Sequence, residues 1–147
     1  MKKILVLVLL IATIVLVGCE TIKSKSTNTN LTNLNPTQLV ETYYKSIASQ
    51  NYSKAEACLS DDIAKQYKNS PDSDFSNIKK LTDLMVSKAA NIKLYGKNYR
   101  EVQVTAEYIV DYKNVITSEN GKQIRFIYVA TKEKNSPWKI ISIGTGP

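Results

Sequence analysis

The sequence predicts an α+β domain in which N-terminal helices pack on one face of an antiparallel sheet. Two observations support this fold class: apolar residues recur at helical spacing between residues 36 and 84, and from residue 100 onwards they alternate with polar residues. Because the helices precede the long strands, the two kinds of element are expected to form separate layers. A chain of 147 residues has room for one such domain.

Residues 1–18 have the pattern of an export signal. Lys2 and Lys3 give a positively charged start, and residues 4–17 are apolar except for Thr13. A membrane-spanning helix needs roughly 20 apolar residues, so this stretch is too short for a permanent anchor. We therefore expect a signal peptide that is removed from the mature protein.

The export signal ends in Leu-Val-Gly-Cys at residues 16–19, which resembles the lipobox of bacterial lipoproteins. The resemblance implies cleavage between Gly18 and Cys19 and a diacylglycerol on the sulfur of Cys19. Two acyl chains attach a protein stably to a bilayer. The expected location is therefore the cell membrane, with the domain lipid-anchored on the extracytoplasmic face.

A disordered tether is expected to connect the lipidated Cys19 to the domain, so that residues 19–35 lie outside the fold. Residues 20–35 are rich in Ser, Thr, Asn and Lys and have no aromatic residue or sustained apolar period. A tether of this length reaches about 20 to 25 Å. The single α+β domain is expected over residues 36–147.

The first helix is expected from Pro36 to about Gln50. Asn35 is a suitable N-cap, Pro36 suits the first helical position, and Gln38 can reach back to complete a capping box. Apolar residues then follow at helical spacing and predict the buried stripe: Leu39, Val40, Tyr43, Tyr44 and Ile47.

A second, short helix is expected after a break at residues 51–52. Ser53 and Glu56 form another capping box, and the helix is predicted to run through Leu59. It contains Cys58 in an Ala-rich stretch. A small apolar residue fits such a position, so we expect a buried thiol, because a reactive one needs an exposed and electropositive setting.

Two more helical segments are expected before the sheet. Ser60 can cap one that runs through Tyr67, with Asp61 and Asp62 near its positive end. Another is expected from about Asp74, where apolar residues again recur at helical spacing: Phe75, Ile78, Leu81 and Leu84.

A short strand is expected at residues 91–95, followed by a long one at residues 100–112. In the long strand even positions are apolar and odd positions polar, with Ile109 as the exception, so one face should be buried and the other solvated. The expected buried residues are Val102, Val104, Ala106, Tyr108, Val110 and Tyr112. The expected solvated residues are Glu101, Gln103, Thr105, Glu107 and Asp111.

Two further strands are expected after the turn at Asn120–Gly121. The strand at residues 123–132 completes a hairpin, and the last strand spans residues 138–143. On the middle strand we expect one side to carry Ile124, Phe126, Tyr128 and Ala130.

Composition excludes several kinds of site. The chain has no His, which rules out Ser-His-Asp and Cys-His catalysis and zinc sites that need imidazole. Without the leader it has 18 basic and 13 acidic residues, a net charge of +5. Only Arg100 and Arg125 are arginines, and Arg is favoured for recognising phosphates and bases, so no nucleic-acid partner is expected. The lysines can attract an anionic wall polymer or simply be solvated.

Two pairs of segments carry a resemblance to known families. Residues 39–47 followed by 51–55 are similar to the opening helix pair of many bacterial lipoproteins, and residues 137–140 with 144–147 resemble the ending of an uncharacterised lipoprotein family from spore-forming Gram-positive bacteria. The order of helices and strands resembles the cystatin-like superfamily that includes nuclear transport factor two and ketosteroid isomerase. This resemblance implies a strongly curved sheet that forms a cone with the helices.

In this superfamily the cone can enclose a pocket. The rings on its wall could bind an apolar or aromatic ligand, or they could simply fill the core, since a small chain needs most of its large apolar groups for stability. No metal site and no cofactor is expected. The residues that the resemblance places on this wall are Tyr43, Tyr44, Tyr108, Tyr112, Phe126, Tyr128 and Trp138.

The expected function is a non-catalytic binding or protein-interaction module. Its partner could be a protein, a small ligand or an anionic wall polymer, and it is expected to be a monomer or a weak homodimer. The alternative is a small-molecule isomerase or hydrolase that uses a Tyr and a carboxylate in the cone. Alternation places Glu107 and Asp111 on the solvated face, which favours the non-catalytic reading.

Overall fold

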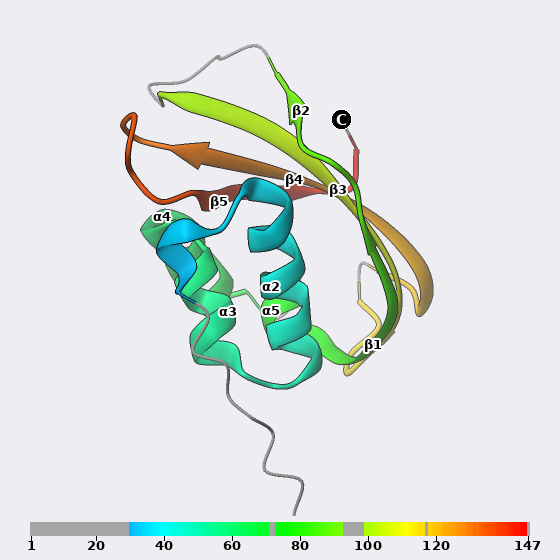
Figure 1. Cartoon of the computed structure of the whole chain (residues 1–147). Helices are drawn as coiled ribbons and strands as arrows, with labels where there is room; N and C mark the ends of the chain where they lie inside the picture. The colour runs from blue at the N-terminus through cyan, green and yellow to red at the C-terminus, as the bar shows by residue number, and fades with distance from the viewer. Residues whose placement is uncertain (1–29, 71–72, 93–98, 117, 147) are drawn as a thin grey trace, which may run out of the picture.

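The computed structural model describes residues 30–70, 73–92, 99–116 and 118–146 (Figure 1). The predicted signal peptide, its cleavage site at Gly18 and the predicted lipidation site Cys19 lie outside these residues. In the described part, the helices precede the strands. The elements in chain order are η1 (Leu31–Asn33), α2 (Pro36–Ala48), α3 (Tyr52–Cys58), α4 (Asp61–Lys68), α5 (Asp74–Asn77), β1 (Ile78–Val86), β2 (Ala90–Asn91), β3 (Arg100–Tyr112), β4 (Gly121–Thr131) and β5 (Lys139–Gly144).

The strands form one antiparallel sheet in the order β1-β3-β4-β5, with β2 also paired to β3. The sheet curves around α2, and α2, α3, α4 and α5 all lie on its concave side (Figure 1). We refer to this concave side as the inner face and to the opposite side as the outer face. The predicted α+β class, with helices on one face of a curved antiparallel sheet, is confirmed.

Helix α2 begins with the expected capping box. The Asn35 side chain accepts a hydrogen bond from the Gln38 amide at 2.9 Å, and the Gln38 side chain accepts one from the Asn35 amide at 3.0 Å. The predicted apolar stripe is buried, and each of its side chains is at most 2% exposed. The helix ends at Ala48, slightly before the expected Gln50, which has a positive φ of 58°.

Helices α3 and α4 are present, but their caps differ from the expected ones. The side chain that caps α3 belongs to Asn51, which accepts a hydrogen bond from the Lys54 amide at 3.2 Å, so the predicted capping box at Ser53 is wrong. Ser60 is the N-cap residue of α4 but makes no side-chain capping bond. Among the described residues, no helix is both long and apolar enough to cross a bilayer.

Residues 78–86 form strand β1, and the helix predicted for this segment is wrong beyond Asn77. Two register shifts in its pairing with β3 insert extra residues, and Asp83, beside the second shift, has a positive φ of 53°. These irregularities place three of the residues that pack on the core three positions apart, which imitates a helical period: Ile78, Leu81 and Leu84. Val86, two positions further on, also packs on the core.

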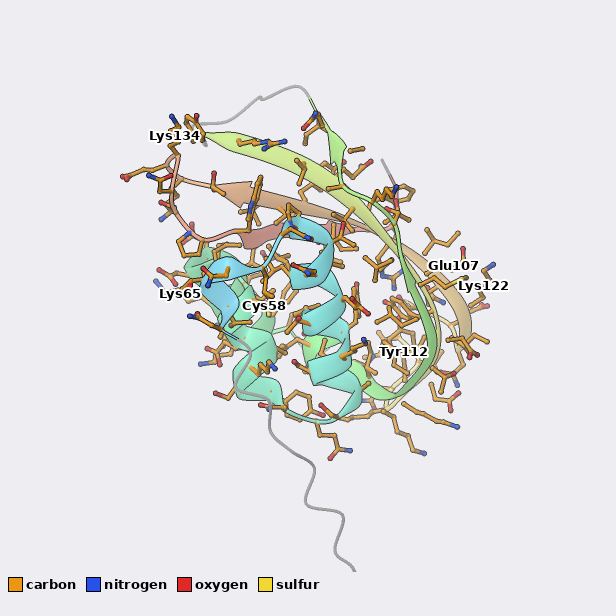
Figure 2. The ribbon with its side chains drawn as sticks, in the orientation of Figure 1. Cys58, Lys65, Glu107, Tyr112, Lys122 and Lys134 are labelled. Atoms are coloured by element: carbon orange, nitrogen blue, oxygen red, sulfur yellow. The ribbon has the colours of Figure 1, made fainter. Side chains whose placement is uncertain are left out.

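Strand β3 has the predicted bounds, and its even-numbered residues from 102 to 112 are buried. Ile109, the exception in the pattern, is 45% exposed. Glu101 corrects the prediction, because it belongs to the solvated set but is only 9% exposed. Figure 2 shows Tyr112 between the sheet and the helices and Glu107 on the outside.

The side of β4 that faces the helices is not the side that carries Phe126 and Tyr128, so these rings do not join the predicted pocket wall. Ile127 lies opposite the buried Val104, so the odd positions of β4 lie on the inner face. Phe126 lies opposite Thr105, on the outer face. The residues at even and at odd positions of β4 both suit a strand. Because the odd positions include the charged Arg125, alternation alone favoured the even positions as the buried side.

The two short strands shift slightly from their expected positions. Strand β2 is observed at Ala90–Asn91, and residues 93–95 of the predicted strand lie outside the described residues. Strand β5 spans Lys139–Gly144 instead of the expected residues 138–143.

The edge of β5 is joined to the helices, because Leu59 forms a parallel bridge with Ile140 and the Ser60 amide donates to the Ile140 carbonyl at 2.8 Å. The connection between α3 and α4 is therefore fixed on the sheet edge.

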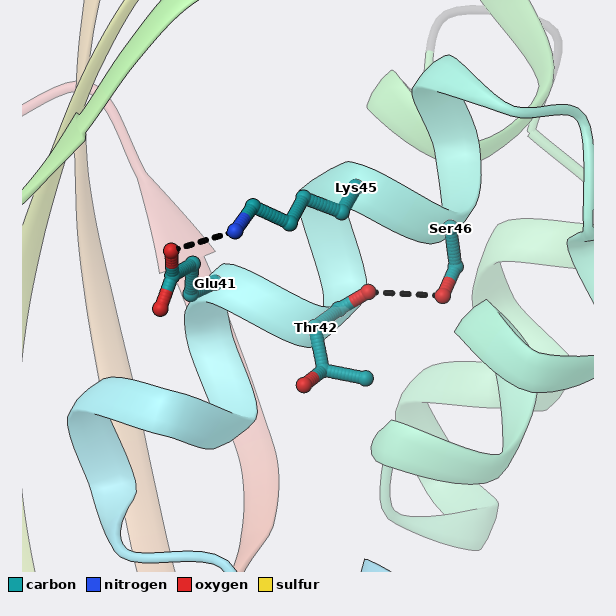
Figure 3. A network of polar contacts seen from close by, with 4 residues as sticks. All are labelled: Glu41, Thr42, Lys45 and Ser46. Atoms are coloured by element: carbon teal, nitrogen blue, oxygen red, sulfur yellow. Dashed lines mark hydrogen bonds and ion pairs between the residues drawn. The ribbon is translucent and has the colours of Figure 1, made fainter. Parts of the chain in front are cut away.

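The solvent side of α2 carries an ion pair, and its flank carries a buried hydroxyl (Figure 3). The Nζ of Lys45 lies 2.6 Å from Oε1 of Glu41, one turn away. Ser46 is 4% exposed, and its Oγ donates to the Thr42 carbonyl at 2.6 Å, which satisfies the hydroxyl. An exposed helical ion pair contributes only about 0.3 to 0.5 kcal/mol, so burial of the apolar stripe holds α2 on the sheet.

Candidate functional site

Three of the predicted pocket residues meet between α2 and β3. The ring centroids of Tyr43 and Tyr44 lie 5.0 Å apart in an edge-to-face arrangement, and the centroid of Tyr44 lies 4.9 Å from that of Tyr108. Each of these side chains is at most 1% exposed. The rings therefore pack on one another and occupy the inner face that could have been a pocket wall.

Tyr112 lies on the inner face beside Arg125. Nη2 of Arg125 donates to the Tyr112 hydroxyl at 3.0 Å and to Ser118 Oγ at 3.3 Å, and Nη1 donates to Gln123 Oε1 at 3.0 Å. Arg125 is only 6% exposed, and a buried guanidinium needs such hydrogen bonds to offset its loss of water. The Tyr112 hydroxyl therefore helps to satisfy the buried guanidinium of Arg125.

The remaining three predicted pocket residues lie elsewhere. Phe126 and Tyr128 point to the outer face, so their predicted place on the inner wall is wrong; the Tyr128 hydroxyl accepts a hydrogen bond from Gln103 Nε2 at 3.1 Å. Trp138 packs at the edge of the core, with the guanidinium carbon of Arg100 5.7 Å from its ring centroid. The seven residues therefore do not form one wall.

The outer face carries carboxylates and exposed apolar side chains side by side. Oε1 of Glu107 lies 2.6 Å from Nζ of Lys122 on the neighbouring strand (Figure 2). Asp111 is exposed opposite Lys80. Glu107 and Asp111 thus lie on the side that alternation predicted. The apolar residues on this face are Met85, Ile109 and Ile124, which are 60%, 45% and 43% exposed.

A cleft of about 260 Å³ opens beside β5. Its walls come from three separate segments, which meet because the connection between α3 and α4 is fixed on β5. We refer to it as the edge cleft. It is lined by Ser60 and Asp61 at the start of α4, by Ala130 and Lys132 at the end of β4, and by Ser136, Pro137, Lys139 and Ile141 on the following turn and strand.

The edge cleft carries charges of both signs. The Nζ of Lys139 donates to the Ala57 carbonyl, in the last turn of α3, at 2.5 Å. Lys132 and Asp61 are exposed, and neither forms an ion pair within the described part of the chain. The carboxylate of Asp61 also suits the positive end of α4. The cleft therefore presents two cations and one carboxylate that do not neutralise each other directly.

Residues 37–144 match a family described as a domain of unknown function, DUF4829. The chain belongs to this family. The match runs from α2 to the end of β5, so it includes the aromatic inner face and all residues of the edge cleft. No curated protein and no solved structure matches the chain.

Cys58 of this DUF4829 domain is buried in α3, as predicted. Its Sγ donates to the Lys54 carbonyl at 3.4 Å. Burial raises the pKa of the thiol to about 11, although the charges of Lys139 and Lys54 act in the opposite direction. A thiol that stays protonated and inaccessible at neutral pH is a packing group and a poor nucleophile.

Sequence reasoning did not find the edge cleft of the DUF4829 domain, because no single segment contains it. The sequence indicated a helix start at Ser60 and a turn before Trp138, but it gave no sign that these two points are neighbours. That proximity depends on the bridge between Leu59 and Ile140, which joins residues far apart in the chain.

Proposed function

We propose that this DUF4829 protein is a bacterial lipoprotein held at the extracytoplasmic face of the cell membrane, and that its domain is a non-catalytic binding or interaction module. One observation carries the second part of the proposal: Tyr44 and Tyr108 pack ring on ring at 4.9 Å across the inner face. Because the chain's own rings fill the inner face, a partner would have to bind at an exposed surface of the domain.

The sequence of the leader supports the anchor. A positively charged start, an apolar stretch at residues 4–17 and the lipobox-like residues 16–19 occur in the order that export and lipidation require. A diacylglycerol on Cys19 would supply two acyl chains, which is enough for stable attachment. The polar segment at residues 20–35 would then separate the domain from the lipid head groups.

The finer family likeness is also a proposal. Helices on the concave side of a curved sheet support a likeness to the cystatin-like superfamily with nuclear transport factor two, and residues 137–140 with 144–147 support a lipoprotein family of Gram-positive bacteria. In this view the partner is a protein, a small ligand or an anionic wall polymer. The charged Glu107–Lys122 pair interrupts the apolar residues of the outer face, which favours a monomer or a weak homodimer.

A non-catalytic binding role fits the positions of the carboxylates and of the Tyr hydroxyl better than an isomerase or hydrolase activity does. Such an enzyme needs a carboxylate and a Tyr hydroxyl facing the same pocket. Glu107 and Asp111 lie on the outer face, and the hydroxyl of Tyr112 accepts a hydrogen bond from Arg125. These positions separate the groups that the enzyme would have to combine.

Mass spectrometry of the full-length chain purified from bacterial membranes tests the anchor. The expected N-terminal residue is Cys19 carrying a diacylglycerol, and the Cys19→Ala variant should lose both the lipid and its retention in the membrane fraction. An intact Met1 on the membrane-extracted protein would contradict the proposal.

A further inference from the structure

The edge cleft combines a hollow with side chains of both charge signs. Its volume of about 260 Å³ lies just below the range of roughly 300 to 1,000 Å³ that is typical of ligand pockets. A cleft of this size suits a ligand of one or two amino-acid residues. Ala130 and Ile141 give part of the lining an apolar character, which suits a small aliphatic side chain.

Backbone contacts position two of the charged residues of the edge cleft, Lys139 and Asp61. Lys139 is fixed by its hydrogen bond to the Ala57 carbonyl, and the start of α4, where Asp61 lies, is fixed by the bond from the Ser60 amide to Ile140. Lys132 follows β4, and its ammonium has no partner among the described residues. A ligand that satisfies all three charges must itself carry both signs.

We propose that the edge cleft binds a small zwitterion of the amino-acid or dipeptide class, with its carboxylate at Lys132 and Lys139 and its ammonium at Asp61. This inference rests on the proposed binding role and gives that role a site and a ligand class. Ser60 and Ser136 add hydroxyls that can orient the polar ends. A compact dianion such as phosphate is disfavoured, because Asp61 repels a second negative charge.

The test uses the full-length chain in detergent micelles and three ligands: L-alanyl-L-alanine, N-acetyl-L-alanine, which lacks the ammonium, and L-alaninamide, which lacks the carboxylate. Trp138 is the only tryptophan in the chain and stands between Pro137 and Lys139, which both line the cleft. Its fluorescence should therefore report binding, and calorimetry detects binding that leaves the indole unaffected.

Matched variants separate the cleft from its surroundings. Lys132→Gln and Asp61→Asn each remove one charge from the lining, whereas Lys134→Gln and Asp62→Asn remove the same charge from residues nearby in sequence that do not line the cleft. All four side chains are exposed, so these substitutions leave the core unchanged.

We expect the dipeptide to bind about 3- to 10-fold more tightly than N-acetyl-L-alanine or L-alaninamide. Lys132→Gln should weaken dipeptide binding by a similar factor, and Asp61→Asn should bring the dipeptide and N-acetyl-L-alanine to equal affinity. The two control variants should change affinity by less than about twofold.

Three outcomes would overturn the proposal: no saturable binding by fluorescence and calorimetry, equal affinity of the wild type for the dipeptide and either single-charge ligand, or equal effects of Asp61→Asn and Asp62→Asn. None of these results concerns the lipid on Cys19, so the proposed anchor stands or falls on its own measurement. If the first of these outcomes is found while another partner binds at a different surface, the general binding role stands and only the site in the edge cleft is excluded.

Discussion

The ring of Tyr44 on α2 lies 4.9 Å from the ring of Tyr108 on β3, with an angle of 43° between their planes. This contact joins the helical layer to the middle of the sheet, and Tyr43 extends it with an edge-to-face contact to Tyr44. Rings buried in this way contribute to stability through the area that they bury and through their mutual geometry. The aromatic residues of the inner face thus act first as the core of the domain.

Replacing Tyr108 by Ala should therefore lower the free energy of unfolding by about 3 to 5 kcal/mol, because a large ring leaves a cavity in a closely packed region. Chemical denaturation measures this loss. The control is Tyr128→Ala on the outer face, where loss of a cross-strand contact should cost about 1 kcal/mol or less. Equal losses for the two variants would show that Tyr108 is not a core residue.

The hydrogen bond from Arg125 to the Tyr112 hydroxyl should be measurable in the same way. Tyr112→Phe removes the acceptor and leaves part of a buried charge unsatisfied, so we expect a loss of about 1.5 to 3 kcal/mol in the free energy of unfolding. Tyr99→Phe, at a residue that is 53% exposed, should change stability by less than about 0.5 kcal/mol. A Tyr112→Phe variant as stable as the wild type would mean that water or another group satisfies Arg125.

The structure and the sequence pattern assign the N-cap of α3 to different residues. Asn51→Ala should lower the free energy of unfolding by about 1 kcal/mol, because Asn51 supplies the side-chain oxygen that caps the helix. Ser53→Ala, at the position that the sequence pattern favoured, should change it by less than about 0.5 kcal/mol. Chemical denaturation measures both losses. If Ser53→Ala lowered the free energy of unfolding more than Asn51→Ala did, the capping box at Ser53 would be correct after all.

The parts of the fold that the sequence predicted are those with a long, regular pattern. Strand β3 keeps its alternation over 13 residues, and α2 combines a complete capping box with an apolar stripe, so both were located correctly. Strand β1 was missed because its bulges move the inward residues to a spacing of three, as at Ile78, Leu81 and Leu84. Local periodicity cannot distinguish this arrangement from a helix.

The candidate site was less predictable because it depends on register and on contacts between distant segments. Whether Phe126 or Ile127 faces the helices is set by the pairing of β4 with β3, which alternation within β4 leaves undetermined. Arg125 reverses the usual expectation, since a charged residue is buried there by its hydrogen bonds to Tyr112 and Gln123. The edge cleft needs three segments to meet, and no pattern in the sequence records that meeting.

Cys58 should make stability depend on pH in the alkaline range. Its pKa is raised from 9.0 to about 11 in the folded protein, so its contribution is fully present below pH 9.0 and is lost as the pH rises toward 11. The loss should amount to about 2 to 3 kcal/mol. Denaturation of the wild type and of Cys58→Ala at both ends of this range isolates the effect, because the lysines titrate in both proteins. Parallel losses in the two proteins would show that the thiol is not the cause.

Nitration of tyrosines by tetranitromethane, followed by peptide mapping, tests most directly whether the inner face is filled. A filled inner face predicts that Tyr99, which is 53% exposed, reacts in the folded protein, whereas Tyr43, Tyr44 and Tyr108 react only after unfolding. Nitration of any of these three in the folded protein at the rate of Tyr99 would contradict it, because the reagent could then reach an open pocket beneath α2.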